Sequence, residues 1–471
     1  MVSNKINESV FKLFRDKLSA LSEVELKTIA HTKRLIERIY GDSKFLDALR
    51  KDPGKGKEFA RGCGADIDPQ DLASVWDRGD PLPLLAEDMG DSPLAKMWAQ
   101  WTTGICDANE LMRSHGDTPE KQPRFHAWRQ RQSKRCESEL GGHSKIFSYP
   151  LFAFELSDGC SMGCPFCGVS AKDFKGAFER TEQNTKLWRS VLEAVLDLFG
   201  DACQTSVCYW ATEPMDNPHY LDYIKDFHEI IGELPQTTTA APLRNVQITR
   251  ELLNMQNRFH AISTRFSVLS TSMLRRVHDN FTPEELVNAR LLLYNKPLYL
   301  KKARAGRHLY SNADPTVTAD GSTIACMSGF VVNMATKKIK LISPCPASEK
   351  WPSGYKVFFE GTFINGDDFR QILKKVVSEN ISSNLENDKV LKLRQDLKYH
   401  STNDGICFSS KYRETSFSGH DFLKEMGDMI ASGEMNTMEI NRKLLASGAD
   451  YFAVIATLQS IFQNGIFDDA L

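Results

Sequence analysis

The sequence predicts an α/β fold with helical regions at both ends. Strand-like and helix-like segments alternate between residues 151 and 320, which indicates parallel strands in an open or barrel-shaped sheet. The first 115 and the last 55 residues read instead as helices separated by Gly and Pro. We therefore expect five regions: a helical N-terminal domain at 1–115, a linker and helix at 116–150, the α/β region at 151–320, a hairpin-containing extension at 321–365 and a helical C-terminal region at 366–471.

The helical ends carry recognisable start and stop signals. Ser22 with Glu25, and Asn436 with Glu439, have the spacing of a capping box, in which each side chain bonds the other residue's backbone N–H. Gly448 separates the last two expected helices. Both ends are therefore expected to contain ordered helices.

Apolar periodicity defines the elements of the α/β region. Strands are expected at 151–156, 206–210, 237–241 and 262–269, and helices at 184–199, 218–231 and 248–258. Thr282, Pro283 and Glu285 form a cap that predicts another helix. In the extension, residues 331–334 and 338–342 predict an antiparallel hairpin.

Composition excludes several classes of protein. The chain has 471 residues, 41% hydrophobic and 25% charged, which is typical of a soluble globular protein. Its net charge of -2 provides no bulk attraction to nucleic acid. No apolar run approaches the ~18 residues that span a bilayer, and the N-terminus has no apolar signal core. We expect a cytoplasmic protein without nucleic-acid or membrane partners.

The cysteines carry the strongest chemical signal. Eleven cysteines, an odd number without an export signal, argue against a disulfide framework. Cys160, Cys164 and Cys167 form a CxxxCxxC array directly after the first strand of the α/β region. Three thiolates on one tight loop can hold three irons of a [4Fe–4S] cluster and leave the fourth iron open for a small chelating ligand. Zinc is the alternative, but one three-cysteine loop lacks the fourth ligand of a closed zinc site.

This array resembles the cluster loop of the radical S-adenosylmethionine (SAM) superfamily. The resemblance implies a partial (β/α)6 radical SAM barrel, with helical N-terminal and C-terminal domains around it here. It also implies that SAM chelates the open iron and is cleaved to a 5′-deoxyadenosyl radical, with an electron donor such as a flavodoxin or ferredoxin. Phe166, the aromatic residue before the third cysteine, fits as a neighbour of the adenine.

Two further segments resemble SAM-contacting parts of that superfamily. Residues 209–214 stand where a Gly-Gly-Glu-Pro turn follows the second strand, so the resemblance assigns Thr212 and Glu213 to SAM, with the carboxylate on the ammonium. Both glycines of that turn are replaced, so the backbone approach differs. The strand at 263–267 resembles one whose polar residues reach the SAM carboxylate and ribose, which implicates Arg265 and Ser267. An arginine on a solvated strand is the alternative.

Residues from about 140 to 365 resemble the proteusin-type radical SAM peptide epimerases, which mature ribosomally synthesised natural products. The resemblance rests on the cluster loop and on residues 209–218, 281–286, 342–348, 351–355 and 360–363. It implies a leader-bearing precursor peptide as the substrate and L-to-D conversion of residues in its core.

A peptide epimerase needs a hydrogen-atom donor, and an S–H bond is a good one. After Cα hydrogen abstraction, a thiol on the opposite face can return hydrogen and invert the residue. Beyond residue 270 the chain has only Cys326, Cys345 and Cys407, too few for a fully cysteine-ligated second cluster. We expect Cys345, or otherwise Cys326, to be the donor; a buried, inert cysteine is the alternative.

Peptide docking has two candidate segments. Residues 286–313 contain six Lys or Arg and no Asp or Glu, which suits an acidic leader or a solvated basic face. Residues 433–467 resemble the helical half of a winged-helix module, which would dock a leader or form a packed cap. Two other functions stay open: a radical SAM maturase forming a thioether, a C–C bond or a methyl group, and a non-enzymatic metal- or leader-binding protein.

Overall fold

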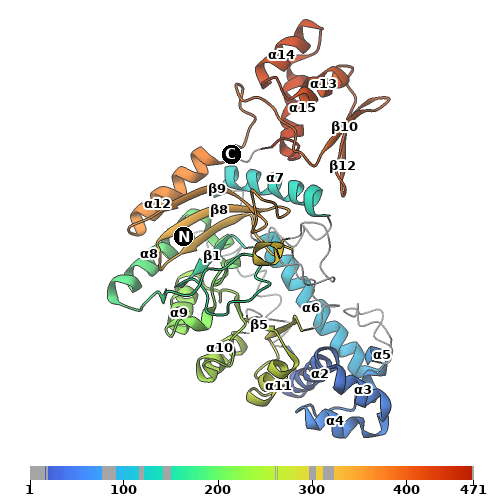
Figure 1. Cartoon of the computed structure of the whole chain (residues 1–471), viewed down its shortest axis with the longest axis vertical. Coiled ribbons are helices and arrows are strands. Elements are labelled where there is room, and N and C mark those ends of the chain that lie inside the picture. The colour runs from blue at the N-terminus through green and yellow to red at the C-terminus, as the bar shows by residue number, and fades with distance from the viewer. Residues whose placement is uncertain are drawn as a thin grey trace.

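The computed structural model describes residues 16, 20–76, 92–115, 121–141, 150–259, 261, 264–295, 304–310 and 323–468. The molecule is elongated (Figure 1), with an α/β body in the middle, N-terminal helices at one end and a C-terminal module (residues 385–468) at the other. Among the described residues, no helix combines the length and apolar character needed to cross a membrane.

The N-terminal region is helical, as predicted. Its helices are α2 (Glu23–Gly41), α3 (Ser43–Lys51), α4 (Gly56–Gly62), α5 (Ala73–Trp76) and α6 (Pro93–His115), with 3-10 turns η1 (Pro53–Lys55) and η2 (Pro69–Leu72). The capping box at Ser22 and Glu25 is confirmed by both of its hydrogen bonds. Helix α7 (Pro123–Leu140) follows and lies along the α/β body (Figure 1), which confirms the helix predicted between residues 116 and 150.

The α/β body alternates strands and helices. Its strands are β1 (Phe152–Glu155), β2 (Ser157–Asp158), β3 (Gly176–Ala177), β4 (Thr237–Thr239), β5 (Thr264–Val268), β6 (Arg290–Leu293), β7 (Gly329–Asn333), β8 (Lys338–Pro344) and β9 (Tyr355–Thr362). Its helices are α8 (Glu182–Phe199), α9 (Tyr220–Ile231), α10 (Val246–Arg258), α11 (Thr271–Asn280) and α12 (Gly366–Lys375).

Six strand positions run parallel. Strand β7 pairs with β1, and β4, β5 and β6 pair in that order. Val207 joins the two groups, because it bridges to β1 on one side and to Gln236, beside β4, on the other. Strands β8 and β9 extend this sheet antiparallel from β7, which confirms the predicted hairpin. The parallel α/β organisation is therefore confirmed as an open series of strands, whereas curvature into a partial barrel stays a prediction.

Two predicted elements of the body differ from the structure. The strand expected at 206–210 is reduced to the bridges of Val207. The helix predicted from Thr282 is wrong: Thr282 and Glu285 form both bonds of the cap, but the chain makes only turns before β6. Leu286 and Ala289 are buried in a core with residues of α10 and β5, so pairing of β6 with β5 prevails over the local helix signal.

The C-terminal region is not uniformly helical, contrary to the prediction for 366–471. Strands β10 (Lys398–Ser401), β11 (Gly405–Ser409) and β12 (Glu414–Ser418) form an antiparallel sheet before helices α13 (Leu423–Ser432), α14 (Thr437–Ala446) and α15 (Tyr451–Gln463). Ile406 and Phe408 of β11 are buried in one core with the three helices. The capping box at Asn436 and Glu439 is confirmed, and Gly448 lies between α14 and α15.

A buried polar cluster joins the N-terminal helices to the body. The guanidinium of Arg34 on α2 donates to the carbonyls of His278 (3.0 Å) and Phe281 (2.5 Å). Glu37, one turn further, contacts Nε2 of His278 (3.3 Å) and accepts a hydrogen bond from Lys33 (2.5 Å). The side chain of His278 is only 1% exposed. Docking of α2 on α11 therefore depends on a histidine held away from water.

Acidification is expected to weaken this docking through His278. Burial lowers its pKa to about 4, from about 6.5 in the unfolded chain. Between these values only the unfolded chain binds the proton, so stability falls as the pH falls. This group should remove about 2 kcal/mol of unfolding free energy between pH 7 and pH 5, and a His278→Asn variant should lack that part of the loss.

Urea titrations at the two pH values measure the loss. His219→Asn is the matched control, because the side chain of His219 is 39% exposed, and it should keep the wild-type dependence. A His278→Asn variant with the full wild-type loss would contradict the assignment.

Candidate functional site

The three cysteines of the predicted cluster site lie on one loop (residues 159–175, the cysteine loop), closed at its base by β2 and β3. The N–H of Cys160 donates to the carbonyl of Lys172 (2.8 Å), and the N–H of Lys175 donates to the carbonyl of Asp158 (2.8 Å). Because β2 directly follows β1, the loop emerges at the carboxyl end of a parallel strand. That end of a parallel sheet is where ligand sites form.

The base of the loop requires glycine and is held from its other side by Asn217. Gly159 has a φ of +85°, and a Cβ there would lie 2.2 Å from the carbonyl oxygen of Asp173. Only glycine tolerates both conditions. The amide of the buried Asn217 donates to the carbonyls of Leu156 (2.8 Å) and Phe178 (3.1 Å), which fixes the two chain segments that enter and leave the loop.

Burial sets the environment of the thiols in the cysteine loop. All three keep part of their surface exposed. Burial is the main cause that raises the pKa of Cys160 and Cys164. In the part of the chain that the structure describes, no three Cys, His, Asp or Glu side chains converge on one ion.

Asp216 holds Ser161, the residue after Cys160, to the segment that follows Val207. It ends the 3-10 turn η6 (Pro214–Asp216). Its carboxylate accepts hydrogen bonds from the backbone N–H (2.8 Å) and the hydroxyl (2.6 Å) of Ser161. Arg244 donates both to Asp216 and to the Ser161 hydroxyl (2.7 Å for the latter). The sequence interpretation gave neither residue a role, although Asp216 lies within the segment 209–218 on which the resemblance rests, because these contacts join residues distant in the chain.

Arg307 holds the other end of the cysteine loop. It lies in the 3-10 turn η7 (Gly306–Tyr310). Its guanidinium donates to the carbonyls of Cys164 (3.1 Å) and Ala171, and its backbone N–H donates to the carbonyl of Cys167 (3.0 Å). Its charge also lowers the pKa of the Cys164 thiol, against the larger opposing effect of burial. The loop is therefore fixed at both ends by cationic side chains.

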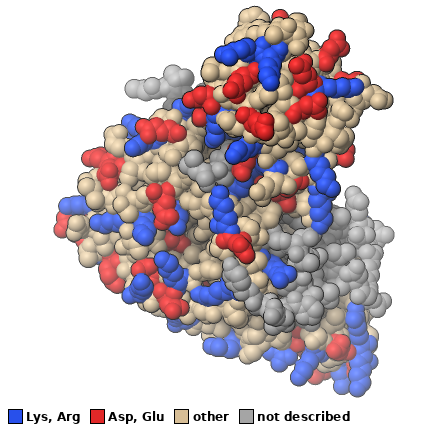
Figure 2. Space-filling model, turned by 45° about the horizontal axis from the view of Figure 1, so that its top comes forward, with Lys and Arg blue, Asp and Glu red and all other residues tan. Residues whose placement is uncertain are grey.

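The basic segment predicted at 286–313 is only partly described. Lys296, Lys301 and Lys302 lie outside the described residues. Arg307 donates hydrogen bonds to the cysteine loop, as described above. Acidic and basic side chains are interspersed over the face of the molecule seen in Figure 2.

Glu213 lies near the cysteine loop, as the resemblance implies, but its carboxylate is already engaged. One oxygen accepts from the N–H of Met215 (3.1 Å) and from the hydroxyl of Thr239, and the other accepts from the N–H of Ala240 (2.9 Å). The residue is 3% exposed, and burial raises its pKa. A carboxylate offers about four acceptor positions, so about one stays open. Thr212 beside it is half-buried.

Arg265 and Ser267 share one face of β5. Both are half-buried, whereas Thr264, Phe266 and Val268 on the opposite face are buried. None of the described residues accepts a hydrogen bond from the Nε of Arg265, although that atom is fully buried. A buried guanidinium nitrogen without an acceptor is costly, so this face suits an anionic ligand group. The structure thus brings the two predicted residues together.

Phe166 connects the cysteine loop to the end of β6. Its ring stacks on that of Tyr294 at a centroid distance of 6.5 Å. Tyr294 directly follows β6, whose neighbour in the sheet is β5 with Arg265. The ring contact therefore joins the cysteine loop to the carboxyl end of β6, whereas Arg265 stands opposite Arg290 at the start of that strand.

Cys326 belongs to this side of the sheet. It is half-buried, and burial is the main cause that raises the pKa of its thiol, while Arg265 acts in the opposite direction. Burial is also the main cause that raises the pKa of Tyr209 and Tyr294. Cys326 raises these two pKa values further, and Arg265 lowers them. Cys326, Arg265, Tyr209 and Tyr294 therefore influence one another electrostatically, and these four residues are here called the interior cluster.

Cys345 lies in a different environment. It is 2% exposed, and burial raises its pKa to about 12. The charged groups that act on it are Arg135 and Glu139 of α7 and Lys356 of β9, not Arg265. The two candidate donors, Cys326 and Cys345, therefore lie among different charged groups.

Glu155 is another residue that the sequence interpretation missed. It ends β1 with its carboxylate buried, and burial raises its pKa. It accepts hydrogen bonds from the N–H of Ala211 (2.7 Å) and from the amide of Asn333 on β7 (2.9 Å). It therefore fixes the turn that carries Thr212 and Glu213.

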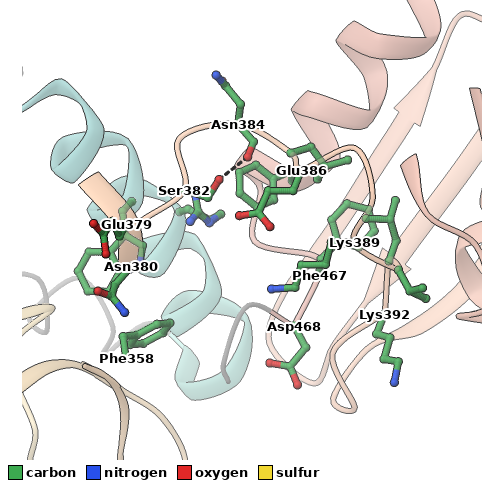
Figure 3. A pocket seen from close by; sticks show the side chains of 16 residues that line it. Phe358, Glu379, Asn380, Ser382, Asn384, Glu386, Lys389, Lys392, Phe467 and Asp468 are labelled. Atoms are coloured by element: carbon green, nitrogen blue, oxygen red, sulfur yellow. Dashed lines mark hydrogen bonds between the residues drawn. The ribbon is translucent and has the colours of Figure 1, made fainter. Parts of the chain in front are cut away.

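A cavity of about 280 Å³ lies away from these residues, between α7, β9 and the C-terminal module. Figure 3 shows Phe358 on the side of α7, and Lys392, Phe467 and Asp468 on the side of the module. None of the residues predicted for the site lines this cavity. The candidate site is therefore the cysteine loop with the interior cluster.

Comparison with known proteins gives one strong sequence match. No family model matches the chain. The chain is 36% identical over 455 residues to "Uncharacterized protein y4wI" of Sinorhizobium fredii (strain NBRC 101917 / NGR234), covering 94% of this chain and 88% of that protein. The crystal structure of BtrN in complex with AdoMet and 2-DOIA matches 49% of this chain and 87% of its own, at 13% identity and a TM-score of 0.30. So low a structural likeness carries no weight for fold or activity.

Proposed function

We propose that this chain, which belongs to the same family as protein y4wI of Sinorhizobium fredii, is a radical SAM enzyme that converts L-residues to D-residues in a leader-bearing precursor peptide. The observation that carries the proposal is the cysteine loop. Three half-exposed thiols stand within eight residues at the carboxyl end of a parallel strand, on a backbone held by Asp216 and Arg307. Such a loop suits a cluster with three protein ligands.

The described residues fit the two cofactors that this function needs. Cys160, Cys164 and Cys167 would hold the [4Fe–4S] cluster. The open acceptor position of Glu213 would take the SAM ammonium, and Arg265 with Ser267 would take its carboxylate and ribose. Phe166 would lie beside the adenine. Once bound and reduced, the two cofactors supply a 5′-deoxyadenosyl radical that removes a hydrogen atom from a peptide Cα.

Cys326 would complete the inversion. Cys326 is half-buried, and its thiol is influenced by Arg265 of the interior cluster. Burial keeps the sulfur protonated, which a hydrogen-atom donor requires. The S–H hydrogen passes to the planar Cα from the face opposite to abstraction. The thiyl sulfur left behind is restored by one electron from the external electron donor and one proton from the solvent.

Chiral analysis of a peptide product tests this function. The reconstituted enzyme is incubated anaerobically in D2O with SAM, dithionite and a precursor peptide encoded beside its gene. Each inverted residue should carry one deuteron at Cα, because the thiol exchanges with solvent before it donates. A loss of mass, a methyl gain or only L-residues in the product would instead indicate a different maturase.

Two cysteine variants separate the candidate donors in the same assay. Cys326→Ala should lose D-residue formation by at least about 100-fold while 5′-deoxyadenosine still forms. Cys345→Ala is the matched control and should keep inversion, since its thiol lies among the charges of α7 and β9. The reverse result would return the donor role to Cys345.

A further inference from the structure

The turn after Cys345 connects the cysteine loop to Cys326. It comprises residues 351–354 (the support turn) and is closed by the bond from the N–H of Gly354 to the carbonyl of Trp351 (2.9 Å). On one side, the carbonyl of Pro352 accepts from the N–H of Gly306 (2.6 Å). The next residue, Arg307, is the one that holds the cysteine loop. The support turn is therefore one hydrogen bond away from the segment that fixes the thiols.

On its other side, the support turn holds the segment that leads to Cys326. The carbonyl of Gly354 accepts a hydrogen bond from the hydroxyl of Thr323 (2.7 Å), and the same hydroxyl oxygen accepts from the N–H of Ala325 (2.9 Å). Thr323 is 8% exposed. One buried hydroxyl thus links the turn to the residue directly before Cys326.

Close packing leaves this connection little freedom. Gly354 has a φ of +70°, and a Cβ there would lie 2.5 Å from the hydroxyl oxygen of Thr323. Ile324, between Thr323 and Ala325, lies directly against the cysteine loop, because a Cβ on Gly168 would come within 2.7 Å of its side chain. The segment 323–326 therefore contacts the loop itself and the turn that supports the loop.

We propose that the support turn, through Thr323, sets the position of the Cys326 thiol relative to the cysteine loop. This inference rests on the proposed function, in which the cofactor radical forms at the loop and the hydrogen donor is Cys326. Thr323 and Gly354 are positioning residues in this scheme. Hydrogen-atom transfer falls steeply with small errors in position, so removing the Thr323 hydroxyl should impair transfer from Cys326 without impairing cofactor binding.

Turnover without peptide in D2O provides the assay, with SAM as the only probe. Dithionite is the sole reductant, and no small thiol is added. The S–D bond of Cys326 breaks and a C–D bond forms at the 5′ carbon of the nucleoside radical. The thiyl sulfur then takes one electron from dithionite and one deuteron from the solvent. Mass spectrometry of the 5′-deoxyadenosine gives the fraction that carries deuterium.

Thr323→Val should lower that deuterated fraction by about tenfold, towards the value measured for Cys326→Ala. The iron content and the total amount of 5′-deoxyadenosine should stay unchanged. Thr323→Ser should restore it. Thr437→Val is the matched control, because the hydroxyl of Thr437 is also buried and donates to a carbonyl, that of Glu386 (2.9 Å), within the C-terminal module. It should match the wild type.

The outcomes separate the two proposals. A wild-type deuterated fraction in Thr323→Val, or an equal fall in Thr437→Val, would overturn the role of the support turn. Wild-type 5′-deoxyadenosine without deuterium would overturn it too, since Cys326 would then be out of reach. Failure of the wild type to form any 5′-deoxyadenosine would instead overturn the proposed function itself.

Discussion

Replacing any one of Cys160, Cys164 and Cys167 with Ala should abolish the iron–sulfur cluster. These thiols are the full set of protein ligands that the loop offers, and a cluster held by two thiolates has two open irons and is readily lost. Anaerobic reconstitution with iron and sulfide should give a brown wild-type protein absorbing at roughly 400 nm. Each variant should lose this band together with its bound iron and sulfide, a reduction of about tenfold or more.

Cys407→Ala is the matched control for these variants. Cys407 lies in β11 of the C-terminal module and is 3% exposed, so its removal deletes a buried thiol far from the loop in the chain. It should keep the full cluster. A single loop variant that retained the wild-type iron content, or a control that lost it, would contradict the assignment of the ligands.

Gly306→Ala is expected to release the cysteine loop although residue 306 binds no cofactor. Gly306 has a φ of +60°, and a Cβ there would lie 2.3 Å from the carbonyl oxygen of Cys167 and 2.6 Å from backbone atoms of Gly168. Backbone atoms cannot rotate aside, so the loop or the segment with Arg307 must move. We expect about tenfold weaker binding of iron at equilibrium with a competing chelator, which corresponds to about 1.4 kcal/mol of lost binding free energy.

Gly433→Ala isolates the contribution of backbone strain to that result. Gly433 has a similar φ of +65°, but a Cβ there meets nothing within 4 Å. The control carries the same kind of strain, of the order of 1 kcal/mol, at the end of α13, and should retain iron like the wild type. Equal losses in both variants would show that the contact of Gly306 with the loop is unimportant.

The parts of the fold that were predicted from the sequence are those with local signals. The apolar run at 151–156 and the periodic segments at 184–199 and 218–231 correspond to β1, α8 and α9. Strands β10 and β12 were missed because their exposed faces are polar and only alternate positions face the module's core. The false helix at Thr282 has a correct cap, but the local signal is outweighed by pairing of β6 in the sheet.

The residues of the candidate site also fall into two groups: those that local sequence signals predicted, and those that depend on tertiary contacts. Spacing alone identified the three cysteines. Arg265 and Ser267 were predicted from the resemblance of their strand to a superfamily strand, and the structure shows them on one face of β5. Asp216, Arg244 and Arg307 were not found, because each acts through contacts with residues distant in the chain. The order of the two donor candidates also depended on tertiary structure, which assigns Cys326 and Cys345 to different sets of charged neighbours.

The most direct test of the account is the fate of SAM. Wild-type protein, loaded with iron and sulfide under strict anaerobic conditions, is given dithionite and SAM, and 5′-deoxyadenosine is measured by liquid chromatography. We expect the nucleoside to accumulate beyond one equivalent per chain, and to be absent when Cys160, Cys164 and Cys167 are all replaced by Ala. Fully loaded wild-type protein that yields no 5′-deoxyadenosine would contradict the central claim.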